Sequence, residues 1–207
     1  MSWPDLNRWS ALWRAAGVDD APVQWYERLT TAYAEPHRHY HNQLHIGECL
    51  VEFDQARHLA VYPAAVELAL WFHDAVYKPR AGDNEEQSAA LLKCCAVETG
   101  VPGSLVETAA RLVMVTKNHE VGADADAALM VDVDLSILGQ SEDRFSEYEQ
   151  QIRKEYGWVP RPIFASKRAE ILQRFLARPT IFATEWFRAK YEQQARRNLK
   201  ASIANLR

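Results

Sequence analysis

The sequence is poor in residues that interrupt helices. Only eight glycines and nine prolines are spread over 207 residues, and runs of β-branched residues with a period of two are scarce. Apolar residues instead recur at intervals of three and four in nearly every segment, as Leu6, Trp9 and Trp13 do, which is the spacing of amphipathic helices. The sequence therefore predicts an all-α protein, a single-domain helical bundle over residues 1–207 with its core at residues 25–200.

Long apolar runs, a disulfide framework and a large net charge are also absent. No apolar run approaches the ~20 residues that span a bilayer, and the N-terminal MSWPDLNRW lacks the basic start and apolar stretch of a signal peptide. Cys49, Cys94 and Cys95 are an odd number without Cys-x-x-Cys spacing, which predicts small buried or half-buried thiols. The formal charge of -4 gives no field toward nucleic acid. We expect a cytoplasmic protein with neither nucleic acid nor a membrane as partner.

Apolar periodicity and turn residues place the predicted helices. These are residues 5–16, 23–34, 41–57, 64–76, 84–98, 103–118, 126–138, 141–156, 166–176 and 184 to the C-terminus. Residues 64–76 are almost wholly apolar, which indicates a central, buried helix. Residues 157–162, with prolines on both sides of Arg161, are predicted to form a loop.

Histidine and aspartate recur in three segments that point to a metal site. His41 and His45 are four residues apart in a predicted helix, so they can face one cavity. The adjacent His73 and Asp74 end a buried helix, where they are costly to desolvate unless a group such as a divalent cation satisfies them. A third segment carries two aspartates, Asp132 and Asp134. Imidazoles and carboxylates together suit Mn, Fe, Co, Ni, Zn or Mg, and the sequence leaves the metal's identity open.

This ordered set resembles the HD superfamily of metal-dependent phosphohydrolases, whose pattern is a histidine, a His-Asp pair and a distant aspartate on successive helices. The resemblance implies an HD-type bundle with four metal ligands: His45, His73, Asp74 and Asp134. Residues 40–45 are also similar to a Tyr-His-Asn-x-x-His stretch of the cyclic-nucleotide phosphodiesterases, in which the first histidine is the general acid and the second binds metal. Residues 133–136 are similar to their Ala-Asp-Leu-Ser stretch, which favours Asp134 over Asp132.

A wider set of motifs looks like a bacterial group of predicted HD-type hydrolases. The motifs are Trp-Phe-His-Asp-Ala-Val-Tyr, Asn-Glu-Glu-Gln-Ser-Ala, Thr-Lys-Asn-His and Asp-Val-Asp-Leu-Ser-Ile-Leu-Gly, and the resemblance covers most of residues 25–200. Related hydrolases often have a His-Glu step before the Ser-Ala, where this chain has Asn84 and Glu85. This departure weakens the case for a second metal ion.

Further residues are candidates for catalysis and for substrate binding. His41 is a candidate general acid or phosphate contact, with the alternative that it only orients a neighbouring group. Glu85 is a candidate base, with a solvated helix start as its alternative, and Asp74 is assigned to catalysis as well as to the metal. Three residues are candidate substrate contacts: Arg38, Lys117 and His119. A surface position for the neighbouring His37 and His39, and the helix dipole at His119, are the competing explanations.

These residues together predict a metal-dependent phosphohydrolase. Water activated by the metal would attack phosphorus in a small phosphorylated substrate, a nucleotide or another phosphomonoester. The alternatives are a di-iron HD-type oxygenase, which needs about six protein ligands, and a binding or regulatory module with a structural metal or none. The chain from Arg188 onward carries six basic residues against one acid, Glu192, which indicates a solvated helix face or a partner contact. The aromatic and basic C-terminal helix also makes a homodimer an expectation.

Overall fold

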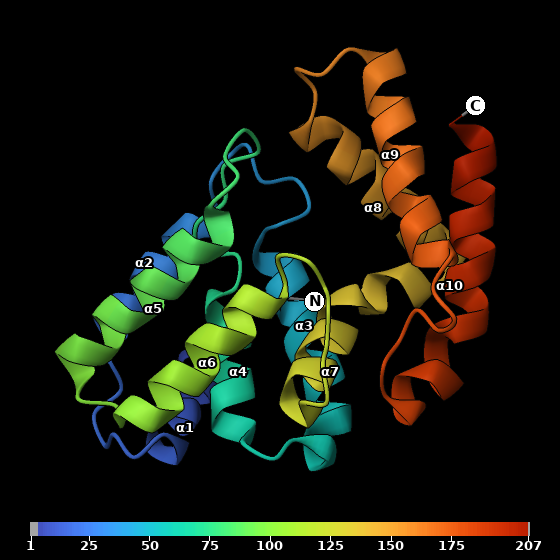
Figure 1. Ribbon diagram of the computed structural model, residues 1–207. Helices are drawn as coiled ribbons and strands as arrows, with labels where there is room; N and C mark the ends of the chain where they lie inside the picture. The colour runs from blue at the N-terminus through green and yellow to red at the C-terminus, as the bar shows by residue number, and fades with distance from the viewer. Residues whose placement is uncertain (1–3, 207) are drawn as a thin grey trace. The chain divides into compact units, whose positions relative to one another are not determined.

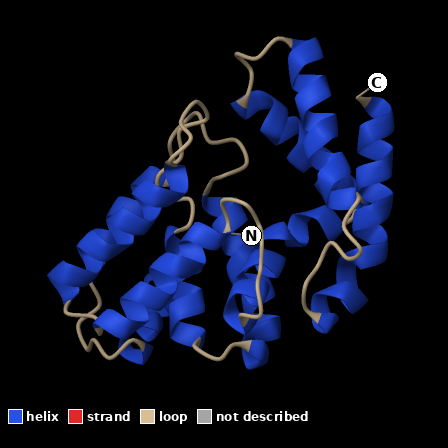
Figure 2. Cartoon of the chain, viewed as in Figure 1, coloured by secondary structure: helices blue, strands red, loops and turns tan. Residues whose placement is uncertain are grey.

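The structure is a computed structural model that describes residues 4–206. Within this range the chain forms ten α-helices and two short 3₁₀ helices and no strand, which confirms the all-α prediction (Figures 1 and 2). The α-helices are α1 (Leu6–Ala15), α2 (Val23–Ala32), α3 (Gln43–Ala56), α4 (Pro63–Phe72), α5 (Asn84–Thr99), α6 (Gly103–Val115), α7 (Ala125–Asp134), α8 (Glu142–Glu155), α9 (Arg161–Leu176) and α10 (Glu185–Asn205). The 3₁₀ helices are η1 (Arg57–Leu59) and η2 (Leu135–Gly139).

The chain divides into two compact units, residues 1–131 and residues 132–207. The first holds α1 to α6 and most of α7, and the second holds η2 and α8 to α10. The predicted extent of one domain over the whole chain stays a prediction. No helix among residues 4–206 combines the length and the apolar character that crossing a membrane requires.

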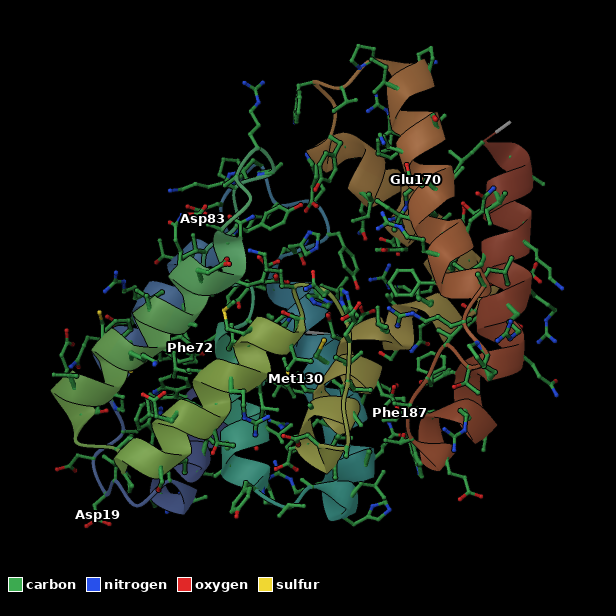
Figure 3. All side chains as sticks on the ribbon, viewed as in Figure 1. Asp19, Phe72, Asp83, Met130, Glu170 and Phe187 are labelled. Atoms are coloured by element: carbon green, nitrogen blue, oxygen red, sulfur yellow. The ribbon has the colours of Figure 1, made fainter. Side chains whose placement is uncertain are left out.

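The first unit is built around α4, as its apolar sequence predicts. All residues from 65 to 72 are buried, and α4 contacts α1, α3, α5 and α6. Figure 3 labels Phe72 at the end of α4 and Met130 in α7, and neither side chain is exposed to solvent. The Trp9 ring meets Trp13 and Trp71 edge-on, at centroid distances of 5.2 and 5.0 Å. Such aromatic pairs each add about 0.5–1.5 kcal/mol beyond area burial, so α1 is fixed firmly against α4.

One buried acid in this core is neutralised by the protein itself. Glu67 lies in α4 with a side chain that is only 4% exposed. It accepts a 2.8 Å hydrogen bond from Arg8 Nε and forms an ion pair with Arg57. These partners satisfy a carboxylate that would otherwise be costly to bury, and they connect α1 and η1 to α4.

The second unit consists of α8, α9 and α10 around η2. Figure 1 shows α9 and α10 side by side, and the two helices are in contact. Asp132 is fully buried and accepts 2.7 Å hydrogen bonds from the backbone N–H groups of Ala183 and Thr184. These bonds hold the segment that leads into α10, where the Thr184 hydroxyl caps the helix by accepting from Phe187 N–H. Phe187, labelled in Figure 3, is buried behind this cap.

The helix boundaries differ from the sequence prediction at three points, two of which place the candidate site residues. α3 begins at Gln43, because the Asn42 side chain accepts from Leu44 N–H and caps the helix there. His41 therefore precedes the helix, and its predicted place on a helical face shared with His45 is wrong. α4 ends at Phe72 with His73 as its C-cap, so Asp74 lies in the following turn.

The third difference lies in the second unit. α9 begins at Arg161, inside the predicted loop of residues 157–162. Proline is tolerated in the first turn of a helix, where the N–H that it lacks would have no partner within the helix. The Pro160-Arg161-Pro162 sequence therefore starts this helix and does not form the predicted loop.

Candidate metal centre

Three potential ligand atoms meet at the junction of α3 and the end of α4. His45 Nε2 lies 3.2 Å from His73 Nε2 and 3.5 Å from Asp74 Oδ2, and His73 Nε2 lies 3.2 Å from the same oxygen. Both histidines are 2% exposed, and the Asp74 side chain is 19% exposed. The structure thus brings together a His-His-Asp group that can hold a metal ion.

Local backbone structure explains why these side chains converge. The Asn42 cap places His45 in the first turn of α3. The His73 backbone N–H donates to Ala69 at 2.8 Å, which keeps His73 on the last turn of α4. The chain then turns sharply, with Ala75 N–H donating to Phe72 at 2.9 Å. The two consecutive residues of the His-Asp pair therefore present their side chains to the same point.

The hydrogen bonds of the His73 ring indicate which nitrogen faces the cluster as an acceptor. His73 Nδ1 lies 2.9 Å from the Leu70 carbonyl oxygen. Because a carbonyl can only accept, Nδ1 carries the proton in the neutral ring, and Nε2 presents its lone pair to the cluster. A backbone carbonyl on the far nitrogen is the usual arrangement for a histidine that binds metal.

The spacing of the three atoms fits a common metal ion. Ligand atoms about 2.0–2.1 Å from a metal lie roughly 2.8–3.4 Å apart at octahedral or tetrahedral angles, close to the observed separations of 3.2, 3.2 and 3.5 Å. Hydrogen bonds explain the same contacts less well. A neutral His73 has no proton on Nε2, and an ionised Asp74 has none, so only His45 Nε2 can donate within the cluster.

The charge state of Asp74 also suits a ligand. Burial opposes ionisation of the carboxyl, but the nearby His73 and His41 and a hydrogen bond from His45 outweigh this effect. The pKa of Asp74 is therefore held well below its usual value. Asp74 is an acceptor-only carboxylate at neutral pH, which is the form that binds cations.

Arg38 holds the backbone around the cluster. Its side chain is 1% exposed. One terminal nitrogen donates to the carbonyl oxygens of Asp74 at 2.6 Å and His41 at 3.2 Å, and the other donates to Ala75 at 3.0 Å. Nε donates to the Glu35 carboxylate at 2.9 Å. The guanidinium thus fastens the segment before α3 to the turn after α4, and its predicted substrate contact stays a prediction.

His41 lies beside the cluster even though it is outside α3. Its ring stacks on Tyr77 with centroids 4.1 Å apart and lies 6.0 Å from the His45 ring. It is half-buried. Stacking limits rotation of the imidazole, so a group that can exchange protons is held next to the potential ligands. Its assignment as general acid stays a prediction.

The other predicted site residues lie around the start of α5 and the end of α6. Lys117 donates to the Gly82 carbonyl oxygen at 3.0 Å and pairs with Glu86. Asn84, at the position where related hydrolases often have histidine, exchanges two 3.0 Å hydrogen bonds with the backbone of Lys78. Glu85 is half-buried in the first turn of α5. The structure thus gives Asn84 a role in holding the loop that follows the His-Asp turn.

His119 differs from these residues in its backbone. Its φ of 52° lies in the left-handed region, which a residue other than glycine seldom adopts. The ring is half-buried. Catalytic or substrate-binding roles for Glu85, Lys117 and His119 stay predictions.

The two aspartates at the end of α7 have different surroundings. Both carboxylate oxygens of Asp132 accept bonds from backbone N–H groups in the second unit, and one accepts from the Thr184 hydroxyl as well. Asp132 is therefore an anchor for the start of α10. Asp134 is half-buried and is the last residue of α7. The prediction that Asp134 is a metal ligand stays a prediction.

Cys49 is a neighbour of the site that is not among the predicted site residues. Its Sγ lies 3.6 Å from His45 Nδ1, one helical turn along α3. The four-residue spacing from His45 was the available signal. All three cysteines are free, as predicted, but Cys94 is exposed rather than buried or half-buried.

No family profile, curated protein or solved structure matches this chain. The resemblance to the HD superfamily therefore rests on the motifs of the sequence. The structure adds an all-helical fold and a His-His-Asp group that can hold a metal ion. These two findings are the basis for a functional proposal.

Proposed function

We propose that this protein is a metal-dependent phosphohydrolase of the HD type that acts on a small phosphorylated substrate, a nucleotide or another phosphomonoester. The observation that carries the proposal is the convergence of His45, His73 and Asp74 at separations suited to a divalent cation. Such a cation, when bound, polarises a phosphoryl oxygen and lowers the pKa of water. Mn, Fe, Co, Ni and Zn accept imidazole as well as carboxylate ligands, whereas Mg prefers oxygen ligands.

The residues of the chain have separate tasks in this proposal. His45, His73 and Asp74 bind the cation, with Asp134 as the fourth ligand that the HD resemblance implies. Arg38 keeps the two ligand-bearing segments at a fixed distance through its bonds to the Asp74 and His41 carbonyl oxygens. Fixed ligands reduce the reorganisation that binding would otherwise require.

His41 is the proposed proton donor to the leaving-group oxygen. Its ring is held by Tyr77 and lies next to His45 without belonging to the three-atom cluster. A protonated imidazole can donate a proton to an alkoxide leaving group. Glu85 is the proposed base, and Lys117 and His119 are proposed contacts for substrate phosphate.

The test joins metal content to phosphate release. The purified protein and His73→Ala are assayed by mass spectrometry for metal and then screened against nucleotides and other phosphomonoesters with added Mn, Co or Ni. We expect about one metal ion per chain and phosphate release from the wild type, and neither from His73→Ala. His58→Ala is the matched control, because His58 is exposed and lies outside the cluster.

Other outcomes point to the alternative functions. Two bound irons per chain with no phosphate release would favour the di-iron oxygenase. Bound metal without turnover of any substrate would favour a binding or regulatory module. If wild type and His73→Ala bind no metal and release no phosphate, the proposed site is wrong.

A further inference from the structure

The second unit contains a cavity of about 770 Å³ between α8, α9 and α10. Its volume falls within the ~300–1,000 Å³ typical of small-molecule sites. All of its lining residues lie between residues 142 and 206. It therefore belongs to the second unit alone and contains none of the residues of the candidate metal centre.

Small side chains leave this space open. Ala165 of α9, which is half-buried, and Ala201 of α10, which is exposed, line the cavity and fill little of the space between the helices. Phe145 and Phe164 supply apolar surface on α8 and α9. The cavity thus offers aromatic and small apolar walls to an occupant.

Cationic side chains gather where α8 ends and α9 begins. Arg153, Lys154 and Arg161 all line the cavity there. Arg153 is held in place, because it donates to the Tyr156 carbonyl oxygen at 2.6 Å and to Val159 at 3.0 Å, and lies over the Phe164 ring. Lys154 and Arg161 are exposed and form no ion pair with a residue that the structure describes.

The acidic side chains of the cavity do not cancel this charge. Glu149 accepts from Arg168 Nε at 3.1 Å and from the Ser202 hydroxyl at 2.9 Å, so its charge is already balanced. Glu142 lies in the first turn of α8, at the opposite end of that helix from Lys154. The end near Lys154 and Arg161 is therefore positive, next to the apolar wall that Phe164 provides.

We propose that this cavity is a second binding site, which takes a small organic anion with an apolar or aromatic body. The anionic group lies between Lys154 and Arg161, and the body packs on Phe145 and Phe164. A phosphate and a carboxylate share this chemistry. The site is independent of the proposed phosphohydrolase activity and of its metal.

Fluorescence titration of the full chain with anilinonaphthalene sulfonate, an aromatic anion, tests the proposal. We expect saturable binding at one site per chain. The double variant Lys154→Glu/Arg161→Glu is expected to weaken binding at least about tenfold, because the anion then meets two like charges. The matched control is Lys167→Glu/Arg174→Glu, the same change of charge at side chains that are 73% and 72% exposed on α9. The control is expected to bind as the wild type does.

Two further measurements separate the contribution of the cationic side chains from that of the shape of the cavity. The uncharged probe phenylnaphthylamine is expected to bind both double variants with similar affinity. Ala201→Trp is expected to abolish binding of both probes, while circular dichroism shows an unchanged helical content. Displacement by adenosine monophosphate would identify phosphate ligands, and displacement by decanoate would identify carboxylate ligands.

Four results would overturn the proposal. One is anion affinity that stays within twofold of the wild type in Lys154→Glu/Arg161→Glu. Another is equal weakening of the neutral probe, which would show an apolar patch without anion selectivity. Loss of binding in His73→Ala would place the probe at the candidate metal centre instead. A dimer in light scattering that Ala201→Trp dissociates, without probe binding to the wild type, would assign the cavity to a second copy of the chain.

Discussion

Asp74 of the first unit has surroundings unlike those of the carboxylates that lie inside the second unit. In the second unit, protein donors satisfy two of them: the half-buried Glu149 faces Arg168 and Ser202, and the buried Asp132 faces backbone N–H groups of residues 183 and 184. In the first unit, Glu67 is likewise balanced by two arginines. Asp74 instead faces the ring nitrogens of two histidines, of which only His45 Nε2 can donate a hydrogen bond to it.

This difference separates structural polar groups from a candidate functional site. A buried acid with a full set of protein donors contributes to the fold and is inert. A buried acid grouped with other acceptors is costly unless a cation joins it. The comparison predicts that substitutions of His45, His73 or Asp74 change metal binding. Substitutions that affect carboxylates already satisfied by protein donors, such as Glu149 and Asp132, are predicted to change stability.

The largest expected effect is on metal affinity, from His45→Ala. The change removes one of three converging ligand atoms, so the dissociation constant is expected to rise more than the ~10–100-fold that loss of a supporting residue costs. Calorimetric titration with Mn or Zn measures it. An affinity within tenfold of the wild type would remove His45 from the site and weaken the contrast between the two units.

The next effect is on stability, from Arg168→Met. The Arg168 side chain is 9% exposed and its partner Glu149 is 18% exposed, so the change leaves a largely buried carboxylate without its cation. Breaking a buried pair costs ~3–5 kcal/mol, and the partial exposure of Glu149 reduces our expectation to about 2–3 kcal/mol. Urea denaturation measures the change, with Lys167→Met as the control on the same helix. Metal affinity is expected to stay the same, and a large loss of it would contradict the division of roles.

Arg38→Lys is expected to act on both properties, because Arg38 is a structural residue next to the metal cluster. Lysine keeps the charge, but its single ammonium group cannot replace the planar guanidinium that donates to three carbonyl oxygens and a carboxylate. We expect metal affinity to fall about tenfold, within the range for residues that support ligands. Titration of the folded variant measures this, and Arg80→Lys at an exposed position is the control. Unchanged affinity together with reduced stability would leave Arg38 with a role in folding only.

The smallest effects are expected at the two aspartates of α7, where one pair of variants distinguishes their roles. Asp132→Asn places an amide N–H₂ opposite the backbone donors of residues 183 and 184, which should cost roughly 1–2 kcal/mol of unfolding free energy without altering metal affinity. Asp134→Asn is expected to weaken metal binding and to leave stability almost unchanged. Thermal unfolding and metal titration of both variants decide the assignment. The reverse result would make Asp132 the ligand.

Much of the fold could be predicted from the sequence, because its signals are local. Helical periodicity and the scarcity of glycine and proline indicated the all-α class, and the apolar run of residues 64–72 indicated the buried helix. The helix starts at Gln43 and Arg161 were missed. The first depends on a side-chain cap by Asn42, and the second on the tolerance of proline in a first helical turn.

The ligand residues of the site could be predicted from the sequence, but the residues that hold the surrounding backbone in place could not. His45, His73 and Asp74 were identified from order and chemistry, and the structure places their ligand atoms together. The role of Arg38 could not be found, because its partners are backbone carbonyl oxygens up to 37 residues away, and a carbonyl oxygen has no sequence signature. The use of Asp132 as an anchor for residues 183 and 184 was hidden for the same reason.

Anomalous X-ray scattering from crystals grown with Mn, Co or Zn tests the central claim most directly. The account predicts a single strong peak about 2.0–2.2 Å from His45 Nε2, His73 Nε2 and an Asp74 carboxylate oxygen. The peak should be absent from crystals of His73→Ala. Wild-type crystals with no peak at these atoms, at metal concentrations that saturate other metalloproteins, would show that the cluster is a hydrogen-bonded feature of the fold and not a metal centre.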